Sequence, residues 1–101
     1  MLIYNVTAKV NWGIHDAWLL WMQHEHMQDV VATGCFSKSQ LTRLLETDEK
    51  EGPTYAAQYF AENKSDYDCY VEIHSTLMRQ KAYEKWGEQF IAFRSLMEIV
   101  Q

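Results

Sequence analysis

Residues 2–12, LIYNVTAKVNW, alternate between an apolar set of side chains and a mixed set, until Gly13 ends the pattern. Successive side chains of a β-strand point to opposite faces, so a period of two over this length predicts a strand with one face on a core. The side chains predicted to face that core are Leu2, Tyr4, Val6, Ala8, Val10 and Trp12.

Beyond this strand, the chain shows the same small unit twice. The apolar period becomes helical over 14–33, Gly34 can end that helix, and a strand over 35–46 completes the first unit. The second unit consists of a strand over 54–62, a helix over 65–86 opened by Ser65, and a strand over 90–100. The order β-α-β-β-α-β predicts a ferredoxin-like α+β fold, with two helices on one face of a four-stranded antiparallel sheet. We expect residues 1–101 to form a single ferredoxin-like domain.

The charge pattern excludes several classes of partner. Nine Lys and Arg against fourteen Asp and Glu give a formal net charge of −5, and the basic residues are scattered singly. We therefore expect no nucleic acid and no membrane among the partners. No apolar run approaches the roughly 18 residues of a membrane span, and the first residues lack the basic region of a signal peptide. Cys35 and Cys69 lie outside any C-x-x-C pair, which favours reduced thiols and a cytoplasmic location.

Two elements have more apolar surface than one sheet and one helix layer can cover. At 100° per residue, the first helix has an apolar stripe, but further apolar residues fall outside it. The stripe contains Ile14, Trp18, Trp21 and Met22, and the residues outside it are Leu19, Leu20, Met27, Val30 and Val31. The last strand is apolar on both faces. These excesses predict a homodimer in which a second copy covers the exposed sheet face. The alternative is a dense monomeric core with scattered surface apolar residues.

Polar side chains on the predicted inner faces indicate a ligand pocket between helices and sheet. Glu25 and Asp29 fall one turn apart near the indole rings, where one carboxyl group could gain a raised pKa, unless both lie in water. His74 falls on the inner stripe of the second helix, as a ligand contact or as a hydrogen-bonded core residue. Arg94 alternates into an apolar strand face, where it either pairs with Glu98 or holds an anionic ligand. The candidate ligand-binding residues are Trp18, Trp21, Glu25, His26, Asp29, His74 and Arg94.

The histidines do not predict a metal centre. His24 and His26 project about 160° apart on a helix, so they cannot share one ion, and no H-E-x-x-H motif is present. His26 with Asp29 would form half a site that still needs a ligand such as His74. No nucleophile or phosphate-binding motif is present either. We expect no metal and no cofactor.

Several strings carry a family resemblance. They are Ile3-Tyr4-Asn5-Val6-Thr7, the motif W-x-x-W-M…E-H…D-V-x-A-T-G-C-F from Trp18 to Phe36, and Phe90-x-Ala92-Phe93-Arg94-Ser95-Leu96. Together they resemble a bacterial family of small proteins, a domain of unknown function, over nearly the whole chain. Its members are similar in fold to the dimeric α+β barrels, whose relatives include cofactor-independent monooxygenases, haem-degrading proteins and muconolactone-type isomerases. The haem-degrading branch uses an Asn, a Trp and a His, residue types that Asn5, Trp21 and His74 also supply.

Two functions fit these observations. The first is a homodimeric small-ligand-binding or interaction module that takes a small apolar or aromatic ligand. The second is a cofactor-independent monooxygenase or isomerase that acts on a small aromatic or polyketide-like substrate, with a histidine in hydrogen-bond reach of a carboxylate or of Arg94. A core filled by its own aromatic side chains favours the module, whereas a void of a few hundred cubic ångströms with convergent polar groups favours the enzyme.

Overall fold

The computed structural model describes residues 1–101 and contains the expected order of elements. The strands are β1 (Leu2–Val10), β2 (Lys38–Arg43), β3 (Thr54–Ala61) and β4 (Phe90–Glu98). The first helix runs through α1 (His15–Trp21), η1 (Met22–His26) and α2 (Met27–Ala32). The second helix runs through α3 (Lys64–Cys69), η2 (Tyr70–His74) and α4 (Ser75–Trp86).

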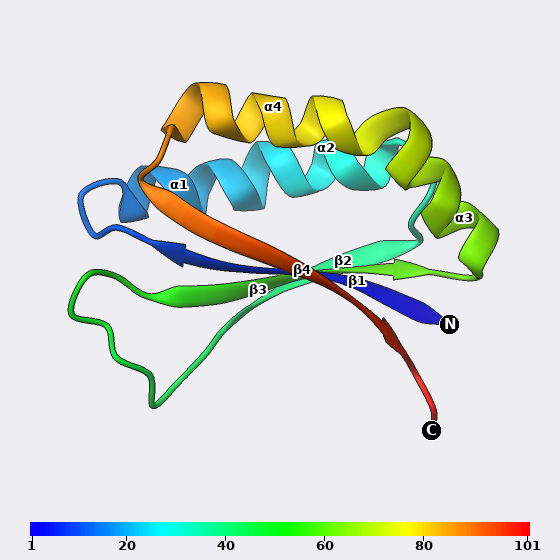
Figure 1. Cartoon of the computed structure of the whole chain (residues 1–101), viewed down its shortest axis with the longest axis horizontal. Coiled ribbons are helices and arrows are strands. Elements are labelled where there is room, and N and C mark those ends of the chain that lie inside the picture. Colours follow the sequence, from blue (N-terminus) through cyan, green and yellow to red (C-terminus); the bar gives the residue numbers. More distant parts are fainter.

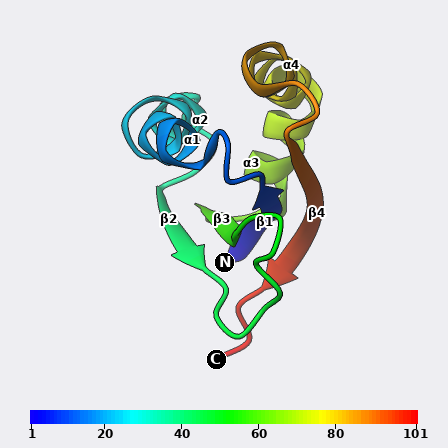
Figure 2. The same ribbon diagram turned by 90° about the vertical axis from the view of Figure 1, so that its left-hand side faces the viewer.

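The four strands form one antiparallel sheet in the order β2-β3-β1-β4. Both helices lie on the same face of this twisted sheet, and its other face carries no covering element (Figures 1 and 2). The ferredoxin-like prediction is confirmed. On β1, Tyr4 stands opposite Tyr59 and Leu96, so these three side chains share the face that the helices cover. Ile3, Asn5 and their neighbours at alternate positions point to the uncovered face.

The core lies between the helices and the sheet and is largely aromatic. Tyr4 packs against Phe36, Tyr59 and Tyr70 with ring centroids 5.5–6.0 Å apart. Most of the residues predicted to face inward from β1 are buried or half-buried, but Trp12 lies beyond the strand end, in the turn, and is 47% exposed. Strand β2 is shorter than the predicted 35–46 at both ends, and Cys35 and Phe36 lie buried in the loop that precedes it.

Each long helix contains a π-helical segment where the sequence predicts a regular α-helix. The amide of Met27 donates to the carbonyl of Met22, and the amide of Ser75 donates to that of Tyr70, so both hydrogen bonds span five residues. A π segment adds one residue to an α-helical turn, and every later side chain is therefore rotated by about 100°. Met27 and Val30 are buried as a result, and the predicted apolar surplus of the first helix shrinks.

The ends of the second helix show one difference from the prediction and one agreement. Asn63, not Ser65, caps the N-terminus, since its side-chain oxygen accepts a hydrogen bond of 3.0 Å from the amide of Asp66. Gly87 ends α4 as predicted, with a φ of +60° that glycine adopts easily.

Candidate functional site

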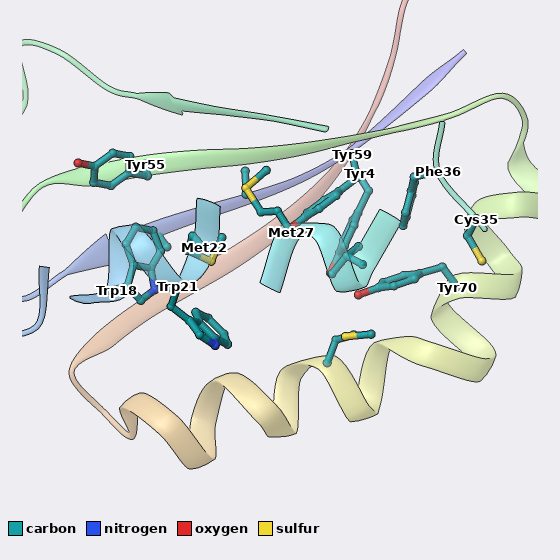
Figure 3. Close-up of a cluster of buried hydrophobic side chains, with 14 of the residues drawn as sticks. Tyr4, Trp18, Trp21, Met22, Met27, Cys35, Phe36, Tyr55, Tyr59 and Tyr70 are labelled. Atoms are coloured by element: carbon teal, nitrogen blue, oxygen red, sulfur yellow. The ribbon is translucent and has the colours of Figure 1, made fainter. Parts of the chain in front are cut away.

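A partly open cavity of about 60 Å³ lies between the helix layer and the sheet. Side chains of β1, β3 and β4 form its floor, and side chains of both helices form its roof. Figure 3 shows the surrounding region filled by aromatic rings and methionines, with Trp18 and Trp21 toward one end and Tyr59 and Tyr70 toward the other. The cavity is the space that a dense aromatic core leaves open.

The structure brings four of the seven predicted site residues to this cavity: Trp18, Trp21, His26 and Arg94. The other three lie elsewhere. Glu25 and Asp29 line a groove on the outer surface, and His74 lines neither space. His74 is half-buried beside Tyr70, with ring centroids 6.2 Å apart.

The two π segments explain which residues reach the cavity. A regular helix would turn Glu25 and Asp29 inward, but the extra residue in η1 places the following residues, His26 and Val30, in those positions. The same one-residue shift in η2 brings Arg79 to the cavity lining beside Met78, although Arg79 remains exposed to solvent. The sequence did not indicate Arg79 as a site residue. One feature of the sequence could have indicated the π segments. In regular α-helices, charged side chains such as Glu25 and Lys81 would fall on the inner faces, and proteins rarely bury such side chains.

His26 forms part of the wall between the cavity and the outer surface. Its ring stacks on Trp21 with centroids 4.4 Å apart and planes inclined by 21°. Burial lowers the pKa of His26 to about 4, although the charge of Asp29 opposes this shift. The ring is therefore neutral at pH 7. Trp21 is fixed in turn by its indole Nε1, which donates a hydrogen bond of 2.7 Å to Glu25 Oε2.

The polar groups of the cavity gather near its β4 and α4 edge. Arg94 Nε donates a hydrogen bond of 3.0 Å to the hydroxyl oxygen of Tyr4, and the expected pairing of Arg94 with Glu98 is absent. Arg79 also lines this edge. Burial raises the pKa of both Tyr4 and Tyr70, and the charges of the two arginines oppose that rise. Both phenols therefore carry their protons at neutral pH.

The outer groove, of about 360 Å³, is wider than the cavity and open to solvent. It shares Trp21 and His26 with the cavity, so these two side chains separate the two spaces. Its remaining lining is charged with mixed sign: Glu25, Asp29, Glu84, Lys81 and Lys85. Such a lining has no preference for one sign of ligand charge.

The residue types of the haem-degrading proteins do not converge here. Asn5 lies on the uncovered face of the sheet, where its amide donates to Thr7 and Ser95. Trp21 lies on the opposite side, in the helix layer, and His74 is absent from the cavity lining. No group of three or more His, Cys, Asp and Glu side chains is placed to hold a metal ion.

The family follows from a match over nearly the whole chain. The model of the family described as "Domain of unknown function (DUF4286)" matches residues 1–100. The chain belongs to this family. The resemblance read from the sequence is confirmed. No curated protein matches this DUF4286 chain significantly.

Solved structures place the DUF4286 chain in the ferredoxin-like fold. SnoaB, a cofactor-independent oxygenase from Streptomyces nogalater, is 11% identical with a TM-score of 0.69, and the match covers 99% of this chain and 93% of SnoaB. An EthD family protein from Bacillus halodurans is 9% identical with a TM-score of 0.67, at 98% and 100% coverage. A dimeric ferredoxin-like protein from an uncultured marine organism is 12% identical with a TM-score of 0.64, at 99% and 95% coverage. Identities this low show a shared fold alone. None of the helices has the length and apolar character needed to cross a bilayer.

Proposed function

We propose that this DUF4286 chain is a homodimeric module that binds a small ligand between its helices and its sheet. The observation that carries the proposal is the cavity, whose lining is mostly apolar with a few polar groups at one edge. Ligand pockets in proteins commonly have this composition, in which apolar walls provide affinity and a few polar groups fix orientation. Trp18, Trp21, His26 and Arg94 are its proposed ligand contacts.

The size of the cavity supports a small apolar or aromatic ligand. About 60 Å³ is less than half of the roughly 150 Å³ of an engineered apolar cavity that binds benzene. Met22 and Met78 line the space, and methionine side chains rearrange easily because they are unbranched and flexible. A short-chain ligand would fit with little change, and an aromatic one would require these two side chains to move.

The uncovered sheet face supports the homodimer. On β4, Ile91 is 74% exposed and Phe93 is 62% exposed, and both point to the face that no helix covers. A second copy on this face would remove both side chains from water. A fold neighbour described as a dimeric ferredoxin-like protein has the same architecture.

The second candidate is a cofactor-independent oxygenase or isomerase that acts on a small aromatic or polyketide-like substrate. SnoaB, which shares the fold, is a cofactor-independent oxygenase, and the neutral ring of His26 at the cavity wall could accept a proton. The module is favoured because the core is filled by its own aromatic side chains, which leave little room for an aromatic or polyketide-like substrate. A cytoplasmic location belongs to the same proposal, and the free thiols of Cys35 and Cys69 are typical of a reducing compartment.

Native mass spectrometry of the chain purified from its own host tests the proposed function. We expect a dimer that carries added small-molecule mass. Ala82→Leu would fill the cavity and remove the added mass, whereas Ala17→Leu, on the exposed side of α1, would keep it. Bare chains, or added mass that survives Ala82→Leu, would contradict ligand binding in the cavity. Oxygen uptake with a bound aromatic compound would favour the oxygenase instead.

A further inference from the structure

The arginines of this chain are distributed unevenly. There are three, Arg43, Arg79 and Arg94. Arg43 is fully engaged on the surface, where Nε and Nη2 donate hydrogen bonds of 3.2 and 2.7 Å to the two carboxylate oxygens of Glu49. The other two both line the cavity while remaining exposed to solvent, and neither forms an ion pair although the chain carries fourteen acidic residues. Two cations without carboxylate partners at one edge of an apolar cavity leave room for an anion from outside.

The donors at this edge point to the geometry of that anion. Arg94 is held by its Nε, which donates to the hydroxyl of Tyr4, so its two terminal nitrogens have no protein acceptor. The only hydrogen bond that the Arg79 guanidinium donates within the chain is a long one, 3.5 Å from Nη2 to Ser75 Oγ. The hydroxyl of Tyr4 still has its own proton to donate. Planar guanidinium groups and phenol donors suit a planar carboxylate, which accepts two parallel hydrogen bonds from arginine.

The apolar walls of the cavity determine which group can be attached to the carboxylate. Beyond the arginines the walls are apolar, formed by side chains such as Trp18, Met22 and Met78. A multiply charged anion would lose much of its hydration there without further charged partners. A single carboxylate on a short hydrocarbon chain needs only one charged end, and its tail matches a space of about 60 Å³.

We propose that Arg79 and Arg94 bind the carboxylate of a small organic acid, with Tyr4 as an additional donor, and that the cavity holds its apolar tail. This inference rests on the proposed function, because it names the ligand class for the same cavity.

The test is a nuclear magnetic resonance titration of the full chain with butanoate, and with butanamide as its neutral counterpart. Each arginine gives one Nε–H signal, so the chain reports on three. We expect the signals of Arg79 and Arg94 to shift on addition of butanoate, while that of Arg43 stays in place because it is bound to Glu49. Butanamide should bind about tenfold more weakly or worse, since hydrogen bonds to a charged group are stronger than those to a neutral one.

Two variants sharpen the result. Arg94→Gln should weaken butanoate binding by about tenfold or more and reduce its advantage over butanamide, whereas Arg43→Gln should change neither. Equal binding of acid and amide would overturn the carboxylate inference and leave the apolar ligand site intact. Signals that respond to neither compound would contradict both the inference and the proposed function. A uniform shift of all three arginines would show nonspecific charge screening and overturn the inference.

Discussion

His26 shows how one buried side chain makes the fold sensitive to pH. Its pKa is about 4 in the folded chain, because burial disfavours the charged ring, whereas an unfolded histidine has a pKa of about 6.5. Between these values the unfolded state binds more protons than the folded state. The contribution of neutral His26 to the free energy of unfolding is therefore fully present above a pH of about 6.5, and it is lost as the pH falls toward 4.

We expect His26→Gln to reduce the loss of unfolding free energy between pH 7 and pH 4 by about 2 kcal/mol relative to the native chain. Urea denaturation at several pH values measures this difference. His24→Gln is the matched control, since His24 lies in the same π segment but is exposed. If the His26→Gln variant and the native chain lose stability in parallel, His26 is not the source of this pH dependence.

Trp21 and Trp86 offer a second comparison at this scale. They pack edge to face with centroids 5.8 Å apart and are similarly buried, 8% and 9% exposed. Trp21 donates its N–H to Glu25, whereas the N–H of Trp86 has no acceptor in the structure. A buried donor without a partner costs free energy, so its removal relieves that cost.

Trp21→Phe should therefore lower the free energy of unfolding by about 1 kcal/mol or more beyond the effect of Trp86→Phe. Only Trp21→Phe removes a hydrogen bond that is formed in the native chain. Chemical denaturation monitored by circular dichroism gives both values. An equal or larger loss for Trp86→Phe would show that its N–H is not a cost to the fold.

At the scale of elements, the sequence predicts strands better than helices. The period of two places Tyr4 and Arg94 on the helix-covered face, and the structure agrees. Trp18 and Trp21 are also placed correctly, since they precede the first π segment. From each π segment onward, the residues that face the core are shifted by one position from the predicted ones. For example, His26 lines the cavity where a regular helix would place Glu25. Hydrophobic periodicity assumes a constant turn, so it cannot register an inserted residue that tertiary packing selects.

We expect each π segment to contain one residue more than a regular helix would need to keep the same core contacts. Deletion of the exposed Glu72 from η2 should yield a regular helix that keeps Met78 and Ala82 facing inward. Deletion of the exposed Gln80 from α4 should instead rotate Ala82 and Trp86 by about 100° relative to Met78. We expect the second deletion to cost at least about 2 kcal/mol more than the first, because it removes large side chains from the core.

Thermal and urea denaturation of the two deletion variants measure this difference. The two proteins lack one residue each from the same helix, so chain length is matched. If loss of Glu72 proves as damaging as loss of Gln80, the π segment is a required part of the packing and the one-residue explanation is wrong.

At the scale of the whole molecule, the uncovered sheet face is the surface whose exposed apolar side chains most need a covering partner. Helices bury one side of the sheet, while Ile91 and Phe93 stand on the other side in water. Part of the surplus predicted for the first helix is buried within the chain, but Leu20 remains 58% exposed. The proposed dimer therefore depends on the sheet and on β4 more than on the helices.

Replacement of both Ile91 and Phe93 by Asn should convert the dimer to monomers, since two polar side chains would be buried at the interface without assured partners. The matched control is Ile73→Asn, which changes a residue that is 66% exposed in the helix layer. The control variant should stay dimeric. Light scattering after size exclusion reports both masses, and a monomeric Ile73→Asn variant would move the interface to the helices.

Sedimentation velocity of the native chain at micromolar concentration decides between the proposed homodimer and a monomer. We expect a particle of twice the chain mass of 12.0 kDa, formed when two sheets cover each other. A single species at 12.0 kDa would mean that Ile91 and Phe93 remain in water, and it would contradict the homodimer on which the proposed function rests.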